Sequence, residues 1–266
     1  MARSDPAEHG GPGGDRAFVE VSILLFAASV AATIYFCESM SASMPMSGGW
    51  TMSMAWMRMP GQTWTGAAAV FLAMWSVMML AMMLPSLVPA LSIYRRSLHG
   101  SAATPVARLT ILAAAGYFFV WVVVGAVVYP VGAIIVAAEM GSPALARFAP
   151  VAIGIAMLLA GTVQLTSWKA RLLLQCRESP CGRSLPASTR SAWRHGIRLG
   201  VRCTLCCIGL MTILIVVGVM DLAAMAIVAT AITVERLAPN PGRAARAAGI
   251  LAVAAGALVI IWSTAA

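Results

Sequence analysis

The chain has 266 residues, of which 61% are hydrophobic and 10% charged, and its mean hydropathy is +0.88. A soluble domain carries roughly 25% charged residues, so this composition excludes an ordinary soluble enzyme or binding domain. The formal net charge is +9, from 18 basic and 9 acidic residues. Anionic lipid at a cytoplasmic membrane face accounts for such a charge, so no nucleic-acid partner is expected.

In chain order, residues 1–16 are polar and rich in Gly and Pro, which predicts a disordered cytoplasmic tail and no cleavable signal peptide. Residues 17–266 predict one all-α domain, a polytopic transmembrane helical bundle. The fifth and sixth predicted helices could instead be one bent span broken at Asp221. We expect about seven helices, built around the apolar segments Phe18–Phe36, Ala67–Ile93, Leu109–Ala138, Pro150–Thr166, Cys203–Met220, Leu222–Val234 and Ala244–Trp262.

The basic residues give the expected orientation. With seven helices and a cytoplasmic N-terminus, all of the 18 basic residues except Arg58 and Arg147 lie on the inner side. This agrees with the positive-inside rule and predicts a C-terminus outside. Residues 38–64 then form a Met-rich external loop and residues 168–202 a basic cytoplasmic loop. The expected location is the inner membrane of a bacterium.

Twelve of the 18 methionines lie between Met40 and Met83. The predicted external loop holds Met40, Met44, Met46, Met52, Met54, Met57 and Met59. In the helix that follows, Met74, Met78 and Met82 are spaced four apart and share one face, with Met79 and Met83 beside them. Thioethers suit Cu(I), but methionine is also an adaptable filler of apolar interiors. A soft-metal path and a simple packing stripe are therefore both open, as is an ordinary kink at Pro85.

The cysteines form the second candidate group. Cys203, Cys206 and Cys207 are expected to begin the fifth helix, with their thiols on one face. Three such thiols suit Cu(I), or Zn²⁺ with a fourth ligand, although cysteines are often merely buried. Cys176 and Cys181 in the predicted basic loop could add ligands. A disulfide framework is not expected at a reducing face.

Other polar residues offer fewer ligands. Asp221, after Met220 at the predicted outer turn, could bind a metal, but an N-cap of the next helix is the more natural role. Glu235 is expected to pair with Arg236 or another neighbour, and Gln164 to form an interhelical hydrogen bond. The three histidines, His9, His99 and His195, all fall in predicted cytoplasmic segments, which argues against a His-rich site in the membrane.

Sequence motifs exclude several activities. The chain has no H-E-x-x-H, G-x-S-x-G or P-loop motif and no pair of intramembrane carboxylates. We therefore expect a protein that is not an enzyme and not an ATP-driven pump.

Three segments resemble the predicted metal-binding integral membrane proteins of bacteria. The first is the run from Met74 to Ser86, close to M-W-x-x-M-x-x-A-M-M-x-P-S. The second runs from Gln164 to Pro180, and the third from Cys203 to Glu235, with Leu210-Met211 and Gly218-Val219-Met220-Asp221-Leu222. The chain departs from the family pattern at Leu172, where the family has a cysteine, and at Ser167 and Ile208. The resemblance implies metal binding in the membrane, with copper as the expected metal.

Together these patterns predict handling of a soft metal ion, Cu(I), by exchange between Met and Cys ligands, with a copper-protein client or membrane complex as partner. The rival hypothesis is a scaffold or assembly subunit of a membrane oxidoreductase, in which the sulfurs only pack. A small-solute permease would need a polar cavity at Gln164 and Asp221. The candidate ligands are Met74, Met78, Met82, Met83, Cys203, Cys206, Cys207, Met220 and Asp221.

Overall fold

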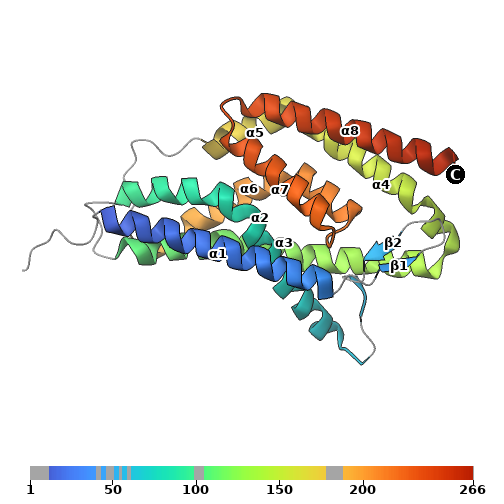
Figure 1. The fold of residues 1–266 in the computed structure, drawn as a ribbon, viewed down its shortest axis with the longest axis horizontal. Coiled ribbons are helices and arrows are strands. Elements are labelled where there is room, and N and C mark those ends of the chain that lie inside the picture. Colours follow the sequence, from blue (N-terminus) through green and yellow to red (C-terminus); the bar gives the residue numbers. More distant parts are fainter. Residues whose placement is uncertain are drawn as a thin grey trace, which may run out of the picture.

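The computed structural model describes residues 12–39, 43–45, 51–53, 56–58, 61–98, 105–177 and 188–265. In these parts the chain is a helical bundle with one short hairpin (Figure 1). The all-α prediction is confirmed. The helices are α1 (Pro12–Ser39), α2 (Trp64–Leu98), α3 (Val106–Gly141), α4 (Pro143–Gln164), α5 (Ser167–Arg177), α6 (Thr189–Val217), α7 (Leu222–Leu237) and α8 (Pro241–Ala265).

Six of the described helices, α1, α2, α3, α4, α6 and α8, are long and apolar enough to cross a membrane. With 16 residues, α7 is about 24 Å long at about 1.5 Å per residue, which is shorter than a bilayer core of roughly 30 Å. The start of α1 and the C-terminus lie at opposite ends of the long axis (Figure 1). That placement agrees with an odd number of passes when α7 is counted. Which end faces the cytoplasm stays a prediction.

Contacts between helices fix how they run. Arg95 near the end of α2 hydrogen-bonds to the Gly14 carbonyl at the start of α1 across 3.0 Å, so these two helices are antiparallel. A Cβ on Gly161 of α4 would lie 2.9 Å from the Gly249 carbonyl of α8, and one on Gly154 would lie 2.9 Å from the Gly256 carbonyl. The pair α4 and α8 is therefore antiparallel and closely packed on small residues.

Two sequence predictions about the later helices were wrong in part. The segment 168–202, expected as a loop, contains all but the first residue of α5 and the first half of α6. Because α6 begins at Thr189, Cys203 lies in the middle of the helix and not at its N-terminus. Between α6 and α7 the chain turns at Gly218, whose φ of 147° favours glycine. The fifth and sixth predicted spans are therefore two helices and not one bent span.

The region before α2 contains a hairpin of β1 (Ser43–Pro45) and β2 (Thr51–Ser53), which pair antiparallel. Trp56 is buried against the ring of Phe71, with ring centroids 5.1 Å apart, and covers Gly132 of α3. This contact anchors the segment to the start of α2 and the end of α3. From Trp64 onward α2 continues through both Pro85 and Pro89 to Leu98.

Candidate metal centre

The methionine ladder of α2 divides between two sides of the helix. Met83 faces α3 and α6, where its Sδ lies 3.9 Å from Cys203 Sγ. Met78 and Met82 line a cavity of about 380 Å³ between α1, α2 and α7, together with Met225. One helix therefore presents thioethers to two separate compartments of the bundle.

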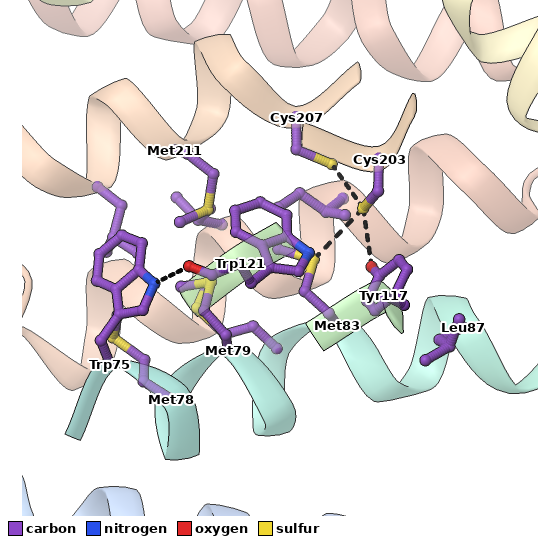
Figure 2. Close-up of a cluster of buried hydrophobic side chains, with 14 of the residues drawn as sticks. Trp75, Met78, Met79, Met83, Leu87, Tyr117, Trp121, Cys203, Cys207 and Met211 are labelled. Atoms are coloured by element: carbon purple, nitrogen blue, oxygen red, sulfur yellow. Dashed lines mark hydrogen bonds between the residues drawn. The ribbon is translucent and has the colours of Figure 1, made fainter. Parts of the chain in front are cut away.

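The thiols of α6 meet Met83 in the core. Cys203 Sγ lies 3.9 Å from Cys207 Sγ and accepts a hydrogen bond of 2.9 Å from the hydroxyl of Tyr117 (Figure 2). Cys206 interacts with the Cys207 side chain on the same face of the helix. The exposed fractions of Cys203, Cys206 and Cys207 are 0%, 1% and 2%. Sulfur atoms from α2 and α6 are thus collected in a dry interior.

The donor set of this cluster is soft. Its sulfur donors are the thiols of α6 and the thioether of Met83, and the hydroxyl of Tyr117 donates a hydrogen bond to Cys203. Within the described ranges, no three His, Cys, Asp or Glu side chains are gathered closely enough to hold a metal ion. A three-coordinate site here would therefore need Met83 beside Cys203 and Cys207. Such sulfur-rich sites suit Cu(I) better than hard cations.

Aromatic side chains pack between α2 and α3 in the same buried core as the cluster. Trp75 and Tyr117 are fully buried and Trp121 is 1% exposed. Trp75 Nε1 donates a 2.9 Å hydrogen bond to the Trp121 carbonyl, which joins α2 to α3 (Figure 2). Phe71 stacks on Trp75 with ring centroids 5.8 Å apart. These rings fill the interface between α2 and α3 and connect the two helices.

An ion pair lies next to the thiol face. Lys169 of α5 binds Glu235 of α7 across 2.7 Å and also donates to the Cys206 carbonyl. Gln164 of α4 donates to the other Glu235 oxygen across 2.7 Å. The predicted interhelical hydrogen bond of Gln164 is confirmed, and the neighbour that pairs with the carboxylate of Glu235 is Lys169 of α5. A charged side chain buried in an apolar interior is costly unless an opposite charge and hydrogen bonds compensate it, and Lys169, Glu235 and Gln164 provide this for one another.

The model of the PpoB2 family, described as a copper chaperone, matches residues 72–259. The chain belongs to this copper chaperone family. The match includes α2 from its methionine ladder onward, all of α6 and α7, and most of α8. The expected relation to a copper-related family is thereby confirmed. No curated protein and no solved structure matches the chain.

This member of the copper chaperone family has a second sulfur contact, between the end of α1 and the turn that follows α6. Cys37 Sγ, at the end of α1, lies 4.0 Å from Met220 Sδ in the turn between α6 and α7. Asp221 beside it is exposed, and its carboxylate accepts a 2.8 Å hydrogen bond from the Ala224 amide. The N-cap role of Asp221 is confirmed. Asp221 caps the start of α7, whereas Gln164 binds Glu235 near the end of the same helix, so the two residues are too far apart to line one polar cavity of a permease.

Several predicted ligands stay predictions. Met74 is buried in the core of α2. Cys181 and the loop residues Met40, Met46, Met54 and Met59 lie outside the described residues, as do the side chains of Met44, Met52 and Cys176. Met44 and Met52 are backbone partners in the hairpin.

Sequence reasoning missed three residues around the sulfurs. Tyr117 and Lys169 were not candidates, and Arg236 was considered only as a partner for Glu235. Tyr117 binds Cys203, Lys169 binds the Cys206 carbonyl and Arg236 binds Ser86. The two partners of each contact are more than thirty positions apart in the sequence, so no local pattern reveals the contact. Lys169 follows an apolar span and precedes Arg171, so in the sequence it looks like an ordinary basic residue at a cytoplasmic helix end and not like a buried partner. One signal could have identified Lys169. Glu235 lies near the end of an apolar helix, and a carboxylate in such a position is expected to have a basic partner.

Proposed function

We propose that this copper chaperone family member handles Cu(I) inside a membrane, binding it at Met83, Cys203 and Cys207 for delivery to a client copper protein. The observation that carries the proposal is the buried contact of Cys203 Sγ with both Met83 Sδ and Cys207 Sγ, each at 3.9 Å. Cys206, one residue before Cys207, could replace either thiol during exchange. This role requires binding and release but no catalysis.

The chemistry of the site supports Cu(I) over Zn²⁺. Cu(I) accepts thiolate and thioether ligands in low coordination numbers. Structural Zn²⁺ almost always takes four ligands, chosen from thiolate, imidazole and carboxylate. The buried carboxylate of Glu235, whose partner Lys169 also binds the Cys206 carbonyl, is already bound by Lys169 and Gln164. A three-sulfur site is therefore better matched to the monovalent ion.

The remaining sulfurs support a route to and from this site. The Cys37–Met220 contact and the cavity lined by Met78, Met82 and Met225 lie on the α1 and α7 side of α2. Neutral thioethers bind Cu(I) weakly enough to exchange it. We propose that they, with the methionines of the external segment, pass the ion between the outer surface and the thiols.

The first test is metal stoichiometry on detergent-purified, anaerobic protein challenged with Cu(I). The wild type should retain roughly one Cu(I) per chain at the buried sulfurs. Cys203→Ser combined with Cys207→Ser should lose it, because hydroxyls are poor ligands for a soft ion. Met157→Leu is the control, because it removes a buried sulfur of α4 that lies outside both the cluster and the proposed route, and this variant should retain the ion.

Absence of Cu(I) from the wild type, or equal amounts in the wild type and the double variant, would contradict the proposal. The sulfurs would then be packing groups, and a scaffold role in a membrane complex would be the better account.

A further inference from the structure

The exposed face of α6 changes from charged to apolar along one stripe. Its first half carries Arg190, Arg194 and Arg198, all exposed and about 6 Å apart along the helix axis because they are four residues apart. The same side of the helix continues with apolar residues, which are also exposed. These are Val201, Leu205 and Ile208, at 44%, 40% and 46% exposure.

The arginines of this stripe have no anionic partner in the described part of the chain. No described carboxylate forms an ion pair with Arg190, Arg194 or Arg198, and α6 itself contains no Asp or Glu. The stripe also lies opposite the buried thiols, so it faces away from the bundle core. A partner for these charges has to come from outside the bundle.

Contacts between α3 and α6 give the level of each arginine. A Cβ on Gly196 would overlap the Ala113 carbonyl, and a Cβ on Gly200 would lie 2.9 Å from the Tyr117 carbonyl. Both contacts join positions 83 apart, so the two helices run parallel with a constant offset. By this offset, Arg194 is level with residue 111 of α3.

At this level α3 presents apolar side chains to its surroundings. Ile111 is 68% exposed, and Phe119, about two turns further along α3, is 49% exposed. Phe119 also contacts Trp193 of α6, with ring centroids 5.6 Å apart. Exposed apolar side chains on a helix that can cross a membrane are expected to contact lipid, and tryptophan is typical of the membrane–water interface. The arginine row therefore lies where lipid headgroups meet hydrocarbon.

We propose that the exposed stripe of α6 is a binding site for an anionic phospholipid. The phosphate binds Arg194 and Arg198, because guanidinium groups match phosphate oxygens in both charge and hydrogen-bond geometry. An acyl chain covers the apolar half of the stripe, from Val201 to Ile208. An acidic soluble protein would pair with the arginines but leave this apolar half uncovered, so a lipid matches the whole stripe better. This inference does not depend on copper binding.

The test is the binding of a fluorescent phosphatidylglycerol to full-length protein in a neutral detergent, followed by anisotropy. Wild type should bind this lipid more tightly than the matching phosphatidylcholine, which has no net charge. Arg194→Gln combined with Arg198→Gln should weaken phosphatidylglycerol binding at least fivefold and leave phosphatidylcholine binding unchanged. Arg194→Lys combined with Arg198→Lys should retain most of the affinity, because it keeps the charge.

The matched control is Arg243→Gln combined with Arg246→Gln. These two exposed arginines of α8 lie outside the stripe, and their loss changes the net charge by the same amount. This variant should bind phosphatidylglycerol as wild type does. Thermal unfolding in the same detergent shows whether each variant is folded, and the exposed arginines of the stripe should be replaceable without loss of stability.

Equal phosphatidylglycerol affinity in wild type and the Arg194/Arg198 glutamine variant would overturn this inference. An equal loss in the α8 control would also overturn it, since that result indicates general attraction by the net charge. Glycerophosphoglycerol, the headgroup without acyl chains, should displace the lipid only at much higher concentration. Displacement at equal concentration would show a simple anion site, and tighter binding of poly-glutamate than of the lipid would identify a protein-docking surface instead.

Discussion

Tyr117 donates its hydroxyl hydrogen bond to Cys203 across 2.9 Å, and both side chains are fully buried. A donor aimed at a sulfur stabilises the thiolate and fixes its orientation toward Met83. Because the Tyr117 hydroxyl is fully buried, its hydrogen bond to Cys203 also holds α3 in a fixed position against α6. Cys203 is thus positioned by its neighbours on three helices, α2, α3 and α6.

Tyr117→Phe should lower Cu(I) affinity by up to about tenfold, the equivalent of one hydrogen bond of about 0.5–1.5 kcal/mol. The change conserves the ring, so folding should be retained. Competition with a chromophoric Cu(I) chelator measures the effect. An affinity equal to wild type would show that the hydroxyl does not act on the bound form, and complete loss of binding would show that Tyr117 does more than orient Cys203.

At the scale of elements, α6 has two contrasting faces. Arginines at every fourth position, Arg190, Arg194, Arg198 and Arg202, form an exposed row. The opposite face is buried and begins with small residues, Ala192, Gly196 and Gly200, before the cysteines. A Cβ on Gly196 would overlap the Ala113 carbonyl of α3, and one on Gly116 would lie 2.7 Å from the Trp193 carbonyl. Close approach of the two backbones brings Tyr117 to Cys203.

Gly196→Ala should therefore destabilise the protein by about 1–3 kcal/mol, the usual cost of overpacking. Gly141→Ala is the matched control, because no atom lies within 4 Å of a Cβ at this position in α3. Thermal unfolding in detergent compares the two variants. Equal midpoints for Gly196→Ala and wild type would contradict the close packing of α3 and α6.

Some helices could be located from the sequence and others could not. Long apolar runs located the six possible spans and α7, because burial in lipid leaves a strong composition signal. They missed α5 and the first half of α6, because charged residues lower the hydropathy there. The fourfold spacing of the α6 arginines and the Ser188 N-cap, which accepts from the Ser191 amide, were the local signals of that helix. The Met83–Cys203 contact joins positions 120 apart and had no local signal.

At the scale of the whole molecule, α2 divides the bundle into two sulfur-bearing compartments. On one side Met83 faces the thiols of α6, and on the other Met78 and Met82 face α1 and α7. The sequence placed Met78 and Met82 on one face of the helix with Met83 beside them, but it could not show which helices they face, since that depends on how α3, α6 and α7 surround α2. Met82 and Met83 are consecutive, so they form a natural matched pair.

The most direct test of the centre is the sulfur coordination of bound Cu(I), measured by X-ray absorption on the wild type, Met83→Leu and Met82→Leu. Leucine nearly conserves the volume of methionine, so both variants should fold. We expect an all-sulfur shell in the wild type, one sulfur fewer in Met83→Leu, and no change in Met82→Leu. A shell that loses its sulfur in Met82→Leu but not in Met83→Leu, or one made of nitrogen and oxygen, would contradict a centre built from Met83, Cys203 and Cys207.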